Sequence, residues 1–180
     1  MTPERAAYHA AMLSHALMLP QGLWDEFDRD FSDDLDREDP LSPLTLELTD
    51  VASDINGTIG VLLRYCREHT PDLSVVYDLV WADLCRRYRS GSLTDQDLCR
   101  LCWNLASFAE DEWDADWDDF RTFCYYYEDY EEWGDQTIPD PLYLQCRELF
   151  LAQHHDLRSA LLQTPEKKTL FQRIREFLHL

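Results

Sequence analysis

A segment near the middle of the chain, residues 110–135, carries most of the side chains that could do chemistry. It holds twelve acidic residues, one arginine and a high density of tryptophan, tyrosine and phenylalanine. Carboxylates in such number could bind a metal ion or act as general acids and bases, whereas tyrosines among carboxylates could anchor a protein interface. The spacing of these residues indicates which of these three roles is favoured.

The acidic segments lack a metal-binding or catalytic motif. The stretch that begins at Asp114 has the alternating aspartates of an EF-hand calcium loop, but Asp119 stands where that loop needs glycine and Tyr125 where it needs glutamate. A di-iron bundle requires two Glu-x-x-His motifs, and the chain offers one, at residues 176–179. The sequence also has no glycine-rich phosphate loop and no nucleophile elbow. We therefore expect no metal, no cofactor and no enzymatic activity.

The six cysteines could also be reactive, as a redox pair or as zinc ligands. Cys99 and Cys102 form a C-x-x-C pair, but no predicted strand precedes it and no second pair lies at the spacing of a zinc site. All six cysteines fall in segments with helical periodicity, which is typical of buried free thiols in a reducing compartment. We interpret them as core residues of a cytoplasmic protein.

The negative charge is concentrated in two segments. Residues 25–39 hold nine acids and two arginines, and residues 110–135 have a net charge of −11, so together they account for nearly all of the overall −20. A field of this sign repels nucleic acid and anionic membranes and attracts basic proteins. No apolar run reaches transmembrane length, and the first twenty residues do not resemble a signal peptide. We expect a basic protein partner, with no direct nucleic-acid or membrane binding.

The elements that carry these residues are predicted to be helices, because apolar residues recur at helical spacing and no stretch alternates convincingly with a period of two. The helix starts are marked by a capping side chain followed by proline, or by a capping box: Thr2-Pro3, Ser42-Pro43, Thr70-Pro71, Asp140-Pro141, Thr164-Pro165, and Thr94 with Asp97. We predict an all-α fold, with one domain over residues 1–180 built as a bundle of about seven helices.

Short connections predict that these helices form antiparallel hairpins. An N-terminal helix is followed by three predicted pairs: 43–69 with 71–90, 95–109 with 114–132, and 142–162 with 165–179. We expect an acidic loop near residues 25–42 and a second loop near 134–140.

The acidic and aromatic residues separate onto two faces when residues 113–131 are placed on one helix. One stripe is predicted to face the core: Trp113, Trp117, Phe120, Cys124 and Tyr127, with Phe123 at its edge. The opposite face, with Thr122 beside it, is predicted to bind a partner: Asp114, Asp118, Asp119, Tyr125, Tyr126, Asp129, Glu131 and Glu132. A secondary acidic patch is predicted on the first acidic segment: Asp28, Asp30, Asp33, Asp34 and Asp36.

These features favour a protein that inhibits or neutralises a basic partner. In size, charge and clustering of acidic with aromatic residues, the chain resembles the acidic immunity proteins that block toxins such as nucleases. A DNA mimic of the anti-restriction or anti-CRISPR type would instead spread carboxylates along an extended surface, whereas a plug needs a compact patch with central aromatic residues. The tyrosines within the acids favour the plug. A helical scaffold or effector chaperone, a helical enzyme, and an acidic face that only aids solubility are the remaining alternatives.

Overall fold

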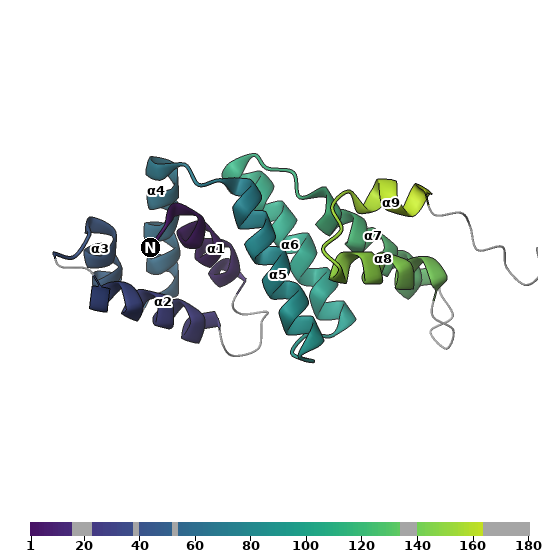
Figure 1. The fold of residues 1–180 in the computed structure, drawn as a ribbon, viewed down its shortest axis with the longest axis horizontal. Helices are drawn as coiled ribbons and strands as arrows, with labels where there is room; N and C mark the ends of the chain where they lie inside the picture. Colours follow the sequence, from purple (N-terminus) through teal and green to yellow (C-terminus); the bar gives the residue numbers. More distant parts are fainter. Residues whose placement is uncertain (16–22, 38–39, 52–53, 134–139, 164–180) are drawn as a thin grey trace, which may run out of the picture.

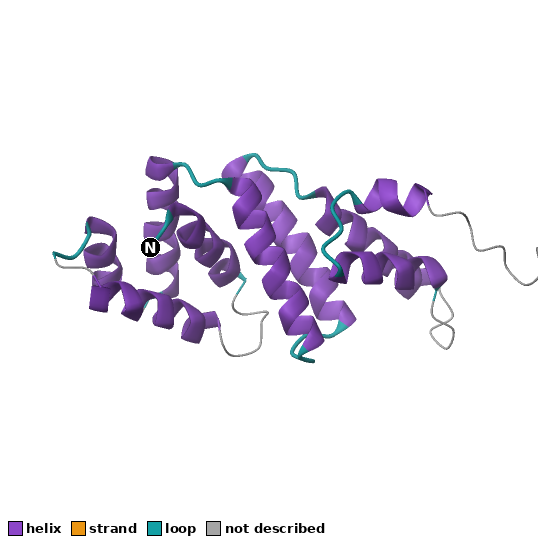
Figure 2. Ribbon diagram, in the orientation of Figure 1, coloured by secondary structure: helices purple, strands orange, loops and turns teal. Residues whose placement is uncertain are grey.

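The computed structural model describes residues 1–15, 23–37, 40–51, 54–133 and 140–163, and these form α-helices with no strand among them (Figures 1 and 2). The helices in chain order are α1 (Pro3–Ser14), α2 (Leu23–Arg37), α3 (Pro43–Val51), α4 (Ile55–His69), α5 (Leu73–Arg89), α6 (Asp95–Trp113), α7 (Asp118–Trp133), α8 (Pro141–Leu151) and α9 (Leu157–Gln163). The all-α prediction is confirmed, with nine helices in the described residues where about seven were predicted.

Most of the predicted helix starts are confirmed by the caps. The Thr2 hydroxyl accepts a hydrogen bond from the Arg5 N–H at the start of α1, and Thr94 forms the predicted capping box with Asp97 at the start of α6. The start of α5 is different. Thr70 lies in the left-handed region (φ 44°) and ends α4, and the side chain of Asp72 caps α5 instead. Thr164-Pro165 lies outside the described residues.

Two segments predicted as single helices are each divided in two. In the first, Asp54 caps a new helix, α4, and a Cβ at position 57 would lie 2.9 Å from its carboxylate, so Gly57 fits the close approach. In the second, Gln153 and Asp156 adopt positive φ between α8 and α9, and the Asp156 carboxylate accepts a hydrogen bond from the Ser159 N–H. Local capping interrupts an apolar period that runs through both segments.

The helices pack as an elongated bundle. In Figure 1, α3 lies at one end, α4 and α1 follow, α5 and α6 lie in the middle, and α7, α8 and α9 form the other end. Helix α4 packs chiefly on α1, which also contacts α5, so the predicted hairpin of 43–69 with 71–90 is wrong. The hairpin of α6 with α7 is confirmed. The partner predicted for 142–162 lies outside the described residues, as do residues 134–139 of the second predicted loop.

Small, buried residues let α1 pack against both α4 and α5. Ala6, Ala7, Ala10 and Ala11 are fully buried, and alanine lets neighbouring helices approach closely on several sides. Residues 23–37 form α2 rather than part of an acidic loop. Its Phe27 and Phe31 are buried and stack with ring centroids 5.8 Å apart, so an apolar stripe fixes this helix despite its charge.

All six cysteines are free thiols buried in the core, as the helical periodicity predicted. The Cys124 thiol of α7 donates to the Cys99 carbonyl of α6 at 3.0 Å, which joins the two helices of the hairpin. Burial raises the pKa of Cys85 to about 11, so this thiol stays protonated at neutral pH.

Candidate partner-binding face

The acidic and aromatic segment contains a helix end that the sequence did not reveal. Helix α6 continues to Trp113, and Asp114 caps its C-terminus in the left-handed conformation (φ 52°), which aspartate tolerates better than most residues. Helix α7 begins at Asp118. The prediction of one helix over 113–131 is therefore wrong at its start, and Asp114 lies on the turn that leads into α7.

The core-facing stripe is nevertheless confirmed for α7 and the turn before it. Trp117, Phe120, Phe123, Cys124 and Tyr127 are buried, and Phe123 is fully buried rather than at the edge of the stripe. These rings pack on α5 and α8 through contacts such as Phe120 with Trp81 and Phe123 with Phe150, whose centroids lie 5.8 Å and 4.6 Å apart. The aromatic residues hold α7 in one orientation and so fix which side chains point outward.

The outer face of α7 presents Asp118, Tyr125 and Asp129 to solvent. These residues are seven and four positions apart, which places them within about 40° of one another around the helix axis. The Tyr125 side chain is 65% exposed, and its ring meets the half-buried Tyr126 edge-on at 5.5 Å. Within the described residues, no ion pair or hydrogen bond engages the Asp118 or Asp129 carboxylate. We call Asp118, Tyr125, Glu128 and Asp129 the α7 outer face.

Asp119 has a structural role that differs from its predicted place in the interface. Its carboxylate accepts hydrogen bonds from the Tyr77 hydroxyl at 3.0 Å and from the Leu157 N–H, the first of α9, at 2.7 Å. Burial and this carboxylate both raise the pKa of Tyr77, so its hydroxyl stays a donor. Thr122 is also buried, contrary to its predicted place beside the exposed face. Asp119 therefore joins α5, α7 and α9.

The single basic residue of the segment, Arg121, pairs with Glu110 and lies 3.8 Å from Asp116, so it neutralises the end of α6 rather than the α7 outer face. Glu128 is exposed and unpaired among the described residues, and its position three residues after Tyr125 could have identified it from the sequence. The side chains of Glu131 and Glu132 lie outside what the structure describes.

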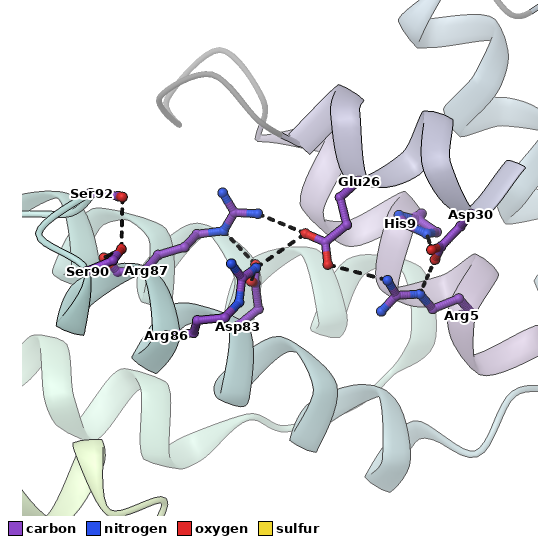
Figure 3. Close-up of polar contacts among 9 residues, drawn as sticks. All are labelled: Arg5, His9, Glu26, Asp30, Asp83, Arg86, Arg87, Ser90 and Ser92. Atoms are coloured by element: carbon purple, nitrogen blue, oxygen red, sulfur yellow. Dashed lines mark hydrogen bonds and ion pairs between the residues drawn. The ribbon is translucent and has the colours of Figure 1, made fainter. Parts of the chain in front are cut away.

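Three residues of the secondary acidic patch are engaged in ion pairs on α2. Asp30 accepts a hydrogen bond from Arg5 and contacts His9 at 2.8 Å, both on α1 (Figure 3). Asp34 pairs with the N-terminal amino group at 2.8 Å. Asp33 pairs with Arg37, one turn later on α2, at 3.3 Å. Asp28 and Asp36 are exposed, and neither has an ion pair with a described residue.

The ion pairs of α2 extend to α5 through Glu26, as Figure 3 shows. Its carboxylate lies 3.4 Å from Arg5, 3.4 Å from Arg86 and 3.1 Å from Arg87. Arg87 also binds Asp83 at 2.7 Å, and the side chains of both residues are less than a tenth exposed. We call Arg5, His9, Glu26, Asp30, Asp83, Arg86 and Arg87 the α1–α2–α5 network. Its acids stabilise the packing of three helices.

The network changes the acid–base properties of its members. Burial lowers the pKa of His9, and this outweighs the contact with Asp30 that favours the charged ring. Burial alone would raise the pKa of Asp30, but the hydrogen bonds from Arg5 and His9 outweigh it, and the pKa is lowered. Asp30 is therefore held ionised and His9 neutral at neutral pH.

The described surface is hollowed both beside the α7 outer face and far from it. A shallow groove of about 210 Å³ runs between α6 and α7 beside Glu128, and a cavity of about 380 Å³ lies between α3, α4 and the N-terminus, away from the α7 outer face. Within the described ranges, no three His, Cys, Asp or Glu side chains gather to hold a metal ion. The described helices include none with the length and apolarity needed to cross a membrane.

Comparison of the chain with models of known protein families, with curated proteins and with solved structures finds no match. The function of the chain is therefore inferred from the geometry of the α7 outer face.

Proposed function

We propose that the chain is an acidic binding protein that neutralises a basic protein partner, in the manner of an immunity protein that blocks a nuclease-like toxin. The observation that carries this proposal is Tyr125, 65% exposed between Asp118 and Asp129, whose carboxylates pair with no described residue. Tyrosine supplies rigid contact area at the centre of an interface, and carboxylates around it steer and orient a basic surface.

The distribution of paired acids supports a compact plug over an extended DNA mimic. A mimic would use the carboxylates of α2 and α7 together as two rows of phosphate substitutes. On α2, however, Glu26, Asp30 and Asp34 are engaged with positive groups of the same chain, which leaves fewer carboxylates to stand in for phosphates. The outward charge is densest on and around α7, where a single basic partner surface could cover it.

Affinity capture with a matched pair of charge-reversal variants tests the proposal. The purified protein is used to capture partners from native lysate, alongside Asp118→Lys/Asp129→Lys and the control Asp28→Lys/Asp36→Lys. Both variants change the net charge equally at exposed positions that have no ion pair with a described residue, but only the first alters the α7 outer face. We expect one stoichiometric basic partner, lost with the first variant and retained with the second, whose own activity is inhibited by the wild-type protein. Equal loss with both variants, or no partner, would contradict the proposal.

A further inference from the structure

The groove between α6 and α7 combines an exposed indole with an exposed carboxylate, which are two groups that attract a cation. Its described lining is Gln96, Cys99, Arg100 and Trp103 from α6 and Tyr127 and Glu128 from α7. Its volume of about 210 Å³ suits one large side chain rather than a helix or a strand. Glu128 also belongs to the α7 outer face, so the groove adjoins the surface proposed to bind the partner.

Trp103 is the unusual residue of this groove. Its side chain is 52% exposed, whereas Trp81 and Trp117 are buried and Trp113 is half-buried against the core. The Trp103 indole makes no ring contact with any described residue. A flat cation is attracted to the face of an indole, and tryptophan is the strongest of the aromatic residues in this interaction.

We propose that this groove receives an arginine side chain of the basic partner, with its guanidinium stacked on Trp103 and hydrogen-bonded to Glu128. The aliphatic part of the arginine would lie along Tyr127 and Cys99, which are nearly buried and form the apolar part of the groove. A guanidinium is planar and presents a fork of donors, whereas the lysine ammonium is a compact point charge, so the groove selects arginine. This inference rests on the proposed function, because the partner supplies the arginine.

Arg100, which also lines the groove, makes no ion pair with Glu128, although both side chains are described and exposed. Arg100 lies instead close enough to Asp97, one turn earlier on α6, to help the Thr94 hydrogen bonds lower the pKa of that carboxyl. Within the described residues, the Glu128 carboxylate therefore has no ion-pair partner and can accept an incoming cation.

Binding of two peptides of equal charge tests the selection of arginine. Octa-arginine and octa-lysine are titrated into the ¹⁵N-labelled protein at physiological salt, with affinities from calorimetry and the Trp103 indole N–H followed by NMR. We expect Trp103→Ala to lower the affinity for octa-arginine about tenfold and the affinity for octa-lysine by less than about twofold. Trp103→Phe should weaken octa-arginine by an intermediate amount, and Glu128→Gln should weaken it more than octa-lysine. Circular dichroism confirms that each variant is folded.

The outcomes separate this inference from the proposed function. One outcome would overturn the arginine site alone. In it, Asp118→Lys/Asp129→Lys lowers the affinity for both peptides, whereas Trp103→Ala lowers the affinity for neither peptide or for both equally. The α7 outer face would then still stand as a surface for a basic partner. If neither peptide binds the wild-type protein, or if Asp28→Lys/Asp36→Lys weakens binding as much as the α7 reversal, both proposals are contradicted. Selective loss of octa-arginine with a shifted Trp103 indole signal supports the arginine site.

Discussion

Helices α2 and α7 are both rich in acids, and each turns aromatic residues toward the core. On α2, Glu26 and Asp30 meet arginines and a histidine of α1 and α5, and Asp34 meets the N-terminal amino group. On α7, Asp118 and Asp129 have no ion-pair partner among the described residues. The comparison shows that the density of acidic residues does not measure the charge available to a partner. What matters is whether the same chain already supplies the counter-charge.

The largest expected effect comes from breaking the α1–α2–α5 network at its buried end. Arg87→Met should lower the free energy of unfolding by about 3–5 kcal/mol, because it leaves Asp83 buried with one of its two partners removed. Urea denaturation measures the change. The control is Arg121→Met, which breaks the partly exposed pair with Glu110 and should cost less than about 1 kcal/mol. Equal costs for the two variants would mean that the network is no more structural than a surface ion pair.

Two neighbouring aspartates of α7, Asp118 and Asp119, allow a direct comparison between an acid without a described partner and a hydrogen-bonded one. Asp119→Ala should cost about 1–3 kcal/mol, because the Tyr77 hydroxyl and the Leu157 N–H would both lose their acceptor. Asp118→Ala, one position earlier, loses only a favourable position in the first turn of the helix and should cost less than about 1 kcal/mol. Thermal and urea unfolding would distinguish them, and a larger cost for Asp118→Ala would reverse the assignment of the two roles.

The network should also make stability depend on pH. The pKa of His9 is lowered in the folded protein, so the unfolded chain binds the proton more readily, and stability is lost as pH falls below the ordinary histidine value of 6.5. The pKa of Asp30 is also lowered, so its contribution is present above the ordinary value of 3.8 and is lost as pH falls below it. The free energy of unfolding should therefore fall in two successive pH ranges as the solution is acidified.

His9→Gln tests the upper range, because glutamine can keep a hydrogen bond to Asp30 without titrating. The loss in free energy of unfolding between pH 7.5 and pH 5.5 should be smaller in this variant than in the wild type. A smaller dependence should remain, because burial also lowers the pKa of His15. If His9→Gln shows the same loss as the wild type, His9 does not titrate with unfolding as described.

The smallest effect on stability is expected at Tyr125. Because its side chain is 65% exposed, Tyr125→Ala should change the free energy of unfolding by less than about 0.5 kcal/mol. The same variant should weaken partner binding by about 2 kcal/mol or more if Tyr125 anchors the interface. Calorimetric titration of the captured partner and a parallel denaturation experiment give the two values. A loss of stability without a loss of affinity would place Tyr125 in the fold rather than the interface.

Local sequence signals predicted much of the fold. The side chains of Thr2, Thr94 and Asp140 cap the helices they were expected to cap, because capping depends on residues within one turn. The break at Asp54 interrupts a continuous apolar period and was missed, and Thr70, expected to cap the next helix, ends α4 instead. The place of α1 against both α4 and α5 depends on packing between distant segments, which the periodicity of each helix does not encode.

The candidate site was predictable to the extent that one helix determines it. Helical spacing placed Asp118, Tyr125 and Asp129 outward correctly, because the buried rings of α7 fix its orientation. Asp119 was misplaced because its partners, Tyr77 and Leu157, are 42 and 38 residues away in the chain. The ion pairs of α2 with α1 and α5 were missed for the same reason, since they join residues up to 61 positions apart.

The most direct test of the α7 outer face as the binding surface is the affinity of one purified basic partner for two charge-matched variants. Calorimetry would compare Asp118→Lys/Asp129→Lys with Asp28→Lys/Asp36→Lys at the same salt concentration. We predict that the α7 variant loses at least about a hundredfold in affinity, whereas the α2 variant stays within about tenfold of the wild type. Equal losses would show that the partner senses only net charge, and this would contradict a defined binding face on α7.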